Sequence, residues 1–222
     1  MKKKTINILS LDGGGSKGVY TLGVLSELEK ASGCKIFEKF DLIYGTSTGS
    51  IIASLLALGM GVDEIKKHYF EIIPAIMTCS GSSNKTKKLE SFAKKIYLEK
   101  GFNDFKTNVG IVAMNYETQT PLIFKTTSAM AHGVKASFEP AFGVKIKDAV
   151  IASCSATPIF KEKVLETSNK GTMVAIDGGF IANNPTLFAI IDSAKGLGYE
   201  IEDTRVLSIG VGNYIEKPIL KF

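Results

Sequence analysis

Short apolar segments alternate with segments of helical spacing along the whole chain, and this alternation constrains the fold more than any other feature of the sequence. Residues 5–11 and 40–44 are mostly apolar, as in buried strands, and each segment ends at a glycine-rich turn. Between them, residues 19–31 carry apolar side chains at every third position, which is helical spacing. Strands that alternate with helices favour an α/β fold with a mostly parallel central sheet.

The rest of the chain is predicted to follow the same pattern. Further strands are expected at residues 109–114, 122–125, 173–176 and 205–209, helices at 50–58, 62–77, 89–98, 144–153 and 185–195, and a mobile loop at 78–88. In sheets of this kind, ligands bind beyond the carboxyl ends of the strands. Three glycine-rich segments follow strands at that edge, so the sequence predicts one site there.

Length and composition are those of one globular domain. The chain has 222 residues, of which 45% are hydrophobic and 22% are charged. No apolar run reaches the roughly 20 residues needed to cross a bilayer. Residues 1–4 are basic, but the hydrophobic stretch of a signal peptide does not follow them. We therefore expect a cytoplasmic protein.

Cysteines, histidines and charge narrow the chemistry further. Three cysteines without CxxC spacing do not make a disulfide framework, and two histidines are too few for a usual His/Cys metal site. The net charge of +5 suits an approach to anionic lipid, although an ordinary solubility charge explains it equally well. We expect no cofactor, no metal and no nucleic acid polymer as a partner.

The segment 45–49 reads Gly-Thr-Ser-Thr-Gly and lies between a predicted strand and an apolar predicted helix. A nucleophilic serine projects its hydroxyl from such a sharp turn, where flanking glycines permit close backbone approach. The following helix directs its N-terminal N–H groups toward developing negative charge. The pattern alone is weak, and a glycine-rich turn with an idle serine is the alternative. The strand before it and the helix after it favour Ser47 as a nucleophile, with Gly45 and Gly49 shaping the turn.

Residues 12–18 read Asp-Gly-Gly-Gly-Ser-Lys-Gly after the first predicted strand. Exposed N–H groups at the start of a helix suit an anion, which in acyl transfer is the tetrahedral oxyanion. The spacing also matches the GxGxxG of dinucleotide-binding folds, but Asp12 would lie beside the pyrophosphate and no acidic residue ends the second strand. A Walker P-loop fails because Lys17 is not followed by Ser or Thr. The candidate anion-binding residues are Gly13, Gly14, Gly15, Lys17 and Gly18.

The base that would activate Ser47 is an open question at this stage. Asp177 follows a predicted strand, so we expect it at the same sheet edge as Ser47. A carboxylate acts as a base when it is held within about 3 Å of the hydroxyl. The hydrolase order of Ser, Asp and His cannot be completed, because His68 and His132 both precede Asp177. Either Asp177 acts without a histidine, or His132 serves in an unusual order.

Together, these motifs resemble one family, the patatin-like phospholipases. The matching segments are 13–18, 45–49 and Asp177-Gly178-Gly179, in the family's order and rough spacing, and residues 152–160 and 183–185 add to the similarity. Lys17 stands where many members carry Arg. The resemblance implies a three-layer α/β/α fold, with residues 1–222 as one patatin-like domain that lacks the further C-terminal helices of many members.

The resemblance also implies an activity. Ser47 would be the nucleophile, Asp177 its base, and the backbone around Gly13 to Gly15 an oxyanion hole, with no cofactor. The substrates would be fatty acyl esters of membrane phospholipids, reached by peripheral contact with the membrane. A looser similarity to bacterial antiviral effectors implies a cyclic nucleotide activator and a homo-oligomer or filament. The alternatives are a regulated membrane-binding module that is inactive without its activator, and a dinucleotide-binding oxidoreductase.

Overall fold

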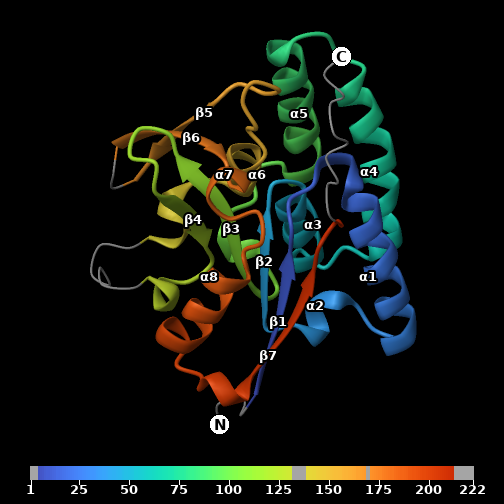
Figure 1. The fold of residues 1–222 in the computed structure, drawn as a ribbon, viewed down its shortest axis with the longest axis vertical. Helices are drawn as coiled ribbons and strands as arrows, with labels where there is room; N and C mark the ends of the chain where they lie inside the picture. Colours follow the sequence, from blue (N-terminus) through green and yellow to red (C-terminus); the bar gives the residue numbers. More distant parts are fainter. Residues whose placement is uncertain (1–4, 132–138, 169–170, 213–222) are drawn as a thin grey trace, which may run out of the picture.

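A seven-stranded sheet forms the centre of the protein (Figure 1). The computed structural model describes residues 5–131, 139–168 and 171–212. The strands are β1 (Ile6–Leu11), β2 (Leu42–Thr46), β3 (Asn108–Asn115), β4 (Pro121–Lys125), β5 (Lys163–Thr167), β6 (Gly171–Asp177) and β7 (Thr204–Ile209). Their order is β5-β6-β3-β2-β1-β7, and β4 also pairs with β3.

Four neighbouring strands make up the parallel part of the sheet. β7, β1, β2 and β3 pair in parallel, as the alternation of strands and helices predicts. β4, β5 and β6 are joined to them by antiparallel pairing. The glycine-rich turns at 12–18 and 45–49 therefore follow parallel strands, whereas the strand that leads to Asp177 runs antiparallel to β3.

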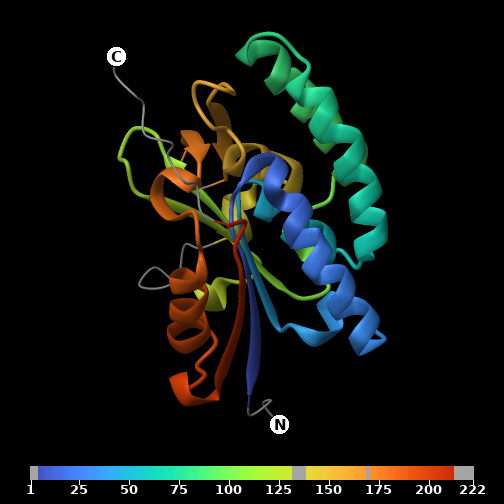
Figure 2. The same ribbon diagram turned by 45° about the vertical axis from the view of Figure 1, so that its right-hand side comes forward.

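Helices cover both faces of the sheet, and this confirms the α/β fold with three layers (Figures 1 and 2). One face carries α1 (Gly18–Ser32), α3 (Thr48–Ala57), α4 (Val62–Met77), α5 (Ser82–Tyr97) and α6 (Ile146–Ser153), and the other carries α7 (Gly179–Ala182) and α8 (Thr186–Ile191). The short α2 (Ile36–Lys39) leads into β2. None of the helices within the described residues is long and apolar enough to cross a membrane.

The two faces bury cores of different size. The larger core lies on the side of α1 and α3–α6, and α3 is buried along its whole length, which is why its sequence is apolar almost throughout. The smaller core lies against α8 and includes Ile8, Tyr44 and Ala189. The site described below lies at the edge of the larger core.

The loop expected at 78–88 is largely helical, so that prediction was wrong for residues 82–88. Gly81, with φ +75°, ends the short turn after α4, and α5 begins at Ser82. Leu89 and Phe92 anchor the amphipathic part of α5 in the core. Extending a helix from an anchored segment adds one hydrogen bond per ordered residue, so a polar first turn forms without a buried face of its own. The polar sequence of residues 82–88 therefore gave no indication that α5 begins two turns earlier than predicted.

Candidate active site

Ser47 occupies a strained turn between β2 and α3. Its backbone has φ 53° and ψ −125°, a conformation that non-glycine residues seldom adopt. A Cβ on Gly45 would lie 2.4 Å from the Gly49 carbonyl oxygen, and a Cβ on Gly49 would lie 2.3 Å from the Leu11 carbonyl oxygen. Both glycines are therefore needed so that α3 can turn back tightly over the ends of β1 and β2. The turn has the geometry of a nucleophile elbow, as the sequence predicts.

Asp177 is brought to Ser47 by β3, which pairs with the strands of both. Thr46 at the end of β2 pairs with Val112, and Asp177 at the end of β6 pairs with Ala113. Because β4 occupies the opposite edge of β3 at these positions, β2 and β6 run toward each other along one edge and meet end to end. The Ser47 hydroxyl donates a hydrogen bond of 2.6 Å to Asp177 Oδ2.

The Asp177 carboxylate is held in a nearly dry position. The residue is 5% exposed, and its Oδ1 accepts a hydrogen bond of 2.6 Å from the Gly179 N–H. Burial raises the pKa of Asp177, while the hydrogen bonds from Ser47 and Gly179 act in the opposite direction. Within the described residues, no lysine or arginine forms an ion pair with it. A carboxylate without a counter-cation, bonded to a serine hydroxyl, is a stronger proton acceptor than one in a salt bridge.

The end of α6 and the residues that follow it tie the turns of Ser47 and Asp177 together. The buried Ser153 hydroxyl accepts a hydrogen bond of 2.9 Å from the Ser47 N–H and donates one of 2.6 Å to the Val112 carbonyl oxygen. The Ser155 carbonyl oxygen accepts a bond of 3.1 Å from the Asp177 N–H. The sequence alone did not assign a role to either serine. The feature that could have pointed to them is their place in the 152–160 segment, which resembles the family.

The glycine loop is also anchored, and its amides differ in availability. The Gly13 N–H donates to the Asn183 carbonyl oxygen over 3.1 Å, and the Asn183 side-chain amide donates to the Gly13 carbonyl oxygen over the same distance. The Gly14 N–H donates to the Thr48 hydroxyl over 3.2 Å. Gly15, with φ +55°, faces open space, and its N–H donates to no residue in the described part of the chain. Among these three amides, that of Gly15 is therefore the most available to an anion.

The other two residues of this loop lie toward α1. A Cβ on Gly18 would lie 2.4 Å from the Tyr69 hydroxyl, so glycine is required for packing there. The Tyr69 hydroxyl donates a hydrogen bond to the Gly15 carbonyl oxygen. Lys17 is exposed and lines the cavities on both sides of the loop.

An apolar cavity of about 350 Å³ opens beside Ser47. Besides Ser47, Thr48 and the glycine loop, it is lined mainly by the apolar side chains of Ile51, Ile73, Ile76, Met77, Leu89, Ala156, Ile159 and Phe160. Cys154 also lines it, but burial raises the pKa of its thiol, so the thiol is not poised as a competing nucleophile. The cavity matches an acyl chain in chemistry, because its walls offer few hydrogen-bonding groups.

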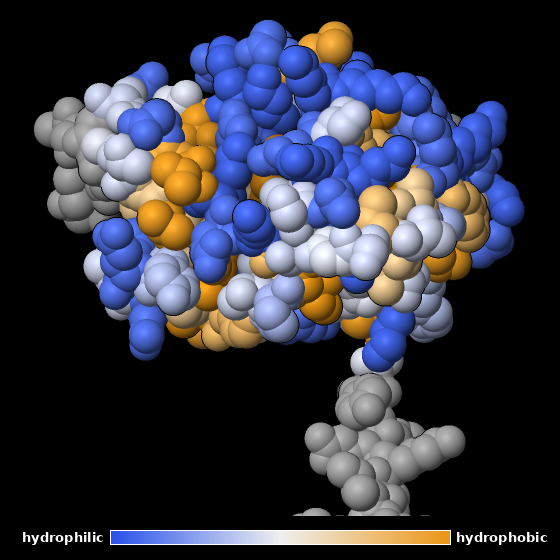
Figure 3. Space-filling view, turned by 90° about the horizontal axis from the view of Figure 1, so that it is seen from above, coloured by the Kyte–Doolittle hydropathy of each residue, from blue (hydrophilic) through white to orange (hydrophobic). Residues whose placement is uncertain are grey.

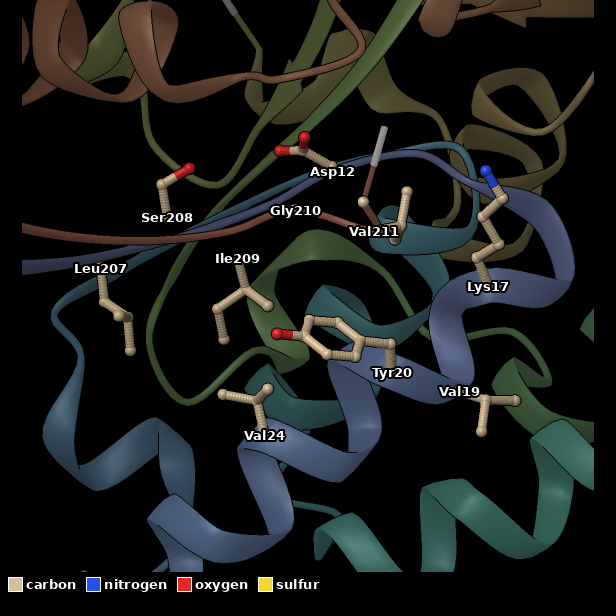
Figure 4. Close-up of a pocket in the computed structure, with 11 residues that line it drawn as sticks. Asp12, Lys17, Val19, Tyr20, Val24, Leu207, Ser208, Ile209, Gly210 and Val211 are labelled. Atoms are coloured by element: carbon tan, nitrogen blue, oxygen red, sulfur yellow. The ribbon is translucent and has the colours of Figure 1, made fainter. Parts of the chain in front are cut away.

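A second cavity, of about 820 Å³, lies between α1 and the end of β7 (Figure 4). Tyr20 and Val24 line it from α1, and Leu207 and Ile209 line it from β7. Neither Ser47 nor Asp177 reaches it. Asp12 also lines it, and burial raises the pKa of this carboxyl, with a hydrogen bond from the Asn184 side chain acting in the opposite direction.

The histidine alternative gains no support from the described residues. His68 lies on α4, where its ring packs edge-on against Phe92 with 6.5 Å between the centroids. No hydrogen bond joins it to Ser47 or Asp177. His132, the other histidine considered for the base, lies outside the described residues.

A serine on an elbow, bonded to a buried carboxylate beside an apolar cavity, is the arrangement of a serine acyl hydrolase. The chain belongs to the patatin-like phospholipase family: the model of that family, described as "Patatin-like phospholipase", matches residues 9–190. This membership sets the dinucleotide-binding alternative aside.

Named relatives agree with this membership, and one solved structure shares the fold. The chain is 49% identical to a cUMP-AMP-activated phospholipase of Escherichia coli over 94% of its own length and 65% of the relative. It is 33% identical to a cGAMP-activated phospholipase of Pseudomonas aeruginosa over 93% of its length and 62% of the relative. The chain therefore spans less than two thirds of these relatives. VipD from Legionella pneumophila shares the fold, with a TM-score of 0.57 and 15% identity over 93% of this chain and 50% of VipD.

Proposed function

We propose that this protein is a serine lipid acyl hydrolase that cleaves fatty acyl esters of membrane phospholipids. The observation that carries the proposal is the 2.6 Å hydrogen bond from Ser47 to the buried, cation-free carboxylate of Asp177. A serine needs an adjacent base to become a nucleophile, and no histidine in the described part of the chain is within reach. The pair therefore acts as a Ser–Asp dyad.

The reaction proceeds through an acyl-enzyme. Asp177 accepts the Ser47 proton as the Ser47 oxygen attacks the ester carbonyl carbon, which gives a tetrahedral oxyanion. The oxyanion collapses, the ester bond breaks, and the leaving alcohol or lysolipid takes the proton from Asp177. Water then attacks the acyl-enzyme with Asp177 again as the base, and the fatty acid is released.

The oxyanion is held by backbone amides. Gly14 and Gly15 line the cavity of Ser47, the N–H of Gly15 is available to the oxyanion, and α3 begins directly after Ser47 with its N-terminal N–H groups. Gly13 supports the loop through its paired bonds with Asn183 rather than by donating to substrate. Lys17 adds positive charge at the mouth.

The substrate is a phospholipid of the cytoplasmic membrane surface. The acyl chain occupies the apolar cavity beside Ser47, and the polar headgroup remains outside with the water. The protein contacts the membrane peripherally, and its three unpaired cysteines fit a cytoplasmic setting. Residues 1–222 act as one patatin-like domain.

Activity depends on a cyclic nucleotide and on assembly into a homo-oligomer or filament. The support is the pair of relatives named as cUMP-AMP-activated and cGAMP-activated phospholipases, which this chain matches over more than nine tenths of its length. An enzyme that destroys the cell's own membrane needs such control, which suits a role in antiviral defence.

Fatty-acid release from phospholipid vesicles tests the function. Wild type and Ser47→Ala are compared side by side, each with and without cUMP-AMP and cGAMP. We expect release by the wild type with an activator and none by Ser47→Ala. No release from either protein under any condition contradicts the hydrolase and favours a membrane-binding module.

A further inference from the structure

The mouth of the Ser47 cavity combines exposed apolar and basic side chains. Met77 and Ile159 line the cavity and are nevertheless 59% and 48% exposed, so they lie at its opening. The buried Ile76 and Leu89 line its interior. An apolar opening that water surrounds is unfavourable unless a partner covers it.

Exposed lysines adjoin the segments that line this opening. Lys87 and Lys88 lie exposed on the first turns of α5, and Lys161 is exposed two residues after Ile159. The Lys161 N–H donates a hydrogen bond of 2.9 Å to the Thr86 hydroxyl, which fixes the 159–161 segment beside α5. We call Met77, Lys87, Lys88, Ile159 and Lys161 the basic rim.

The charge of the basic rim is positive along the start of α5, because residues 72–89 contain lysines but no aspartate or glutamate. Two acidic residues lie at its edge: Glu162 follows Lys161 and is exposed, and Glu90 pairs with Lys163 over 4.0 Å. The α4–α5 turn forms the top of the molecule in Figure 1, and the view from above shows hydrophobic patches set among hydrophilic side chains (Figure 3). Lysines beside apolar side chains are the combination that binds an anionic lipid surface.

We propose that the basic rim docks on the surface of an anionic phospholipid bilayer. This inference rests on the proposed function, because an acyl chain reaches Ser47 only if the cavity opens onto the bilayer. The lysines bind anionic headgroups, and Met77 and Ile159 enter the boundary between headgroups and acyl chains. The substrate then moves into the cavity without crossing water.

Vesicle sedimentation of Ser47→Ala protein tests the docking without hydrolysis. The vesicles contain phosphatidylcholine alone or phosphatidylcholine with phosphatidylglycerol. The rim variant Lys87→Gln/Lys88→Gln/Lys161→Gln is compared with Lys30→Gln/Lys67→Gln/Lys94→Gln, which removes the same charge from exposed lysines elsewhere. We expect the rim variant to bind anionic vesicles at least about tenfold more weakly and the control to bind nearly as the parent. Equal losses in the two variants, or equal binding to both vesicle types, overturn the proposal.

Tryptophan fluorescence tests the insertion of the apolar side chains. The chain contains no tryptophan, so a single introduced one reports its own surroundings. In the Ser47→Ala protein, we expect Ile159→Trp to shift its emission to the blue on anionic vesicles and to be quenched by brominated acyl chains. Leu187→Trp, on the exposed face of α8 where Leu187 is 66% exposed, serves as the control and shows neither effect. An unchanged Ile159→Trp spectrum overturns the insertion.

Failure of the docking is distinguishable from failure of the enzyme. Hydrolysis of a soluble short-chain ester by the wild type in the presence of cUMP-AMP or cGAMP, lost in Ser47→Ala, establishes the dyad independently of any membrane. Ester hydrolysis without vesicle binding refutes the docking alone and directs attention to an acidic protein as the partner of the lysines. Vesicle binding without ester hydrolysis refutes the dyad alone.

A different observation, the hydrogen bonding of Ser153, carries a second inference. We infer that Ser153 is a positioning residue for the nucleophile. Its hydroxyl is the acceptor for the Ser47 N–H and is itself fixed by donation to Val112, while its carbonyl oxygen accepts from the Gly178 N–H over 3.3 Å. Ser153 thus links the strained backbone of Ser47 to the turn that carries Asp177.

Ser155 supplies a matched control for this inference. It is equally buried, but its hydroxyl donates to the Ile151 carbonyl oxygen of α6. The bond from the Asp177 N–H goes to the backbone carbonyl of Ser155, which Ser155→Ala keeps. We expect Ser153→Ala to lower kcat and the rate of covalent labelling of Ser47 by a fluorophosphonate about 10- to 100-fold, with little change in KM. Ser155→Ala is expected to label within about twofold of wild type.

Rescue separates positioning from general destabilisation. Ser153→Thr keeps the hydroxyl, and we expect it to restore labelling relative to Ser153→Ala when both are folded at the assay temperature. Labelling of folded Ser153→Ala at the wild-type rate overturns the inference. So does a Ser155→Ala variant that loses as much labelling as Ser153→Ala at the same melting temperature.

Discussion

Two buried aspartates on opposite faces of the sheet have different charged surroundings. Asp177 and Asp192 are 5% and 1% exposed, and each accepts a hydrogen bond from a hydroxyl group, Ser47 in one case and Tyr44 in the other. Asp192 also forms an ion pair of 2.8 Å with Lys125, whose side chain is itself 12% exposed. Asp177 has no ion pair within the described residues and lies beside the cavity of Ser47.

The difference separates a carboxylate that is paired with a cation from the carboxylate that we propose as the base. The cation of Lys125 stabilises the charge of Asp192. Through its bonds to Tyr44 and Lys125, Asp192 joins the end of α8 to β2 and β4 in the smaller core. Burial together with the Asp192 charge and hydrogen bond raises the pKa of Tyr44 well above its ordinary value, so its hydroxyl stays protonated as a donor. No cation among the described residues forms an ion pair with Asp177, its pKa is raised, and its hydroxyl partner lines the apolar cavity. Burial is common to both sites, whereas the counter-charge distinguishes them.

The largest effect is expected at Asp177. Asp177→Asn removes the base while keeping the shape of the side chain, so we expect ester hydrolysis to fall by about a thousandfold or more. The turnover of a soluble ester by purified, folded protein measures this loss of activity. If most of the rate survives in Asp177→Asn, the comparison fails and His132 becomes the better base.

Asp192→Asn is expected to lower the stability of the protein rather than its activity. It leaves the Lys125 charge buried without its partner, and we expect a loss of about 3 kcal/mol in the free energy of unfolding. Urea denaturation measures this loss. The rate per folded molecule is expected to stay near that of the wild type, because Asp192 touches neither Ser47 nor the cavity. A variant of full stability but low activity would instead connect Asp192 to the chemistry.

The pH dependence sharpens the contrast. Because the folded-state pKa of Asp177 is raised, its ionised form lowers stability above that pKa, and this cost disappears as the pH falls below it. We therefore expect Asp177→Asn to be at least as stable as the wild type at neutral pH, with the wild type gaining relative to the variant on acidification. Urea midpoints across the pH range test this sign.

Activity should follow the same ionisation in the opposite sense. Asp177 acts as a base only when ionised, so the rate falls as the pH decreases through its raised pKa, above the value of about 3.9 for an exposed aspartate. The pH profile of kcat/KM on a soluble ester gives the midpoint. An acid limb at or below the ordinary aspartate pKa would contradict a desolvated base.

The smallest effect is expected from Tyr44→Phe. It removes one hydrogen bond to Asp192 and retains the Lys125 ion pair, so we expect a loss of about 1–2 kcal/mol in stability and no change in activity. Urea denaturation and ester turnover of the same preparation check both. A larger loss than that of Asp192→Asn would mean that the ion pair contributes less than the hydroxyl.

The sequence by itself determined the elements and the motifs of the site. The predicted helix at 62–77 coincides with α4, and the strands before residues 12 and 45 appear as β1 and β2. These features are local: the spacing of apolar residues follows the periods of helices and strands, and glycines mark the turns where backbones cross closely. The elbow at Ser47 was predictable for the same reason.

Only the tertiary structure decided how these parts combine. Ser47 and Asp177 meet because β2 and β6 pair with adjacent residues of β3, and a contact between residues 130 positions apart leaves no local trace in the sequence. Two further hydrogen bonds also join residues far apart in the sequence. The Gly13 N–H donates to Asn183, and the Ser47 N–H donates to Ser153. The proposal of Asp177 as the base also depends on the tertiary structure, because the pKa of a carboxylate is set by the water, charges and donors around it, and folding arranges these.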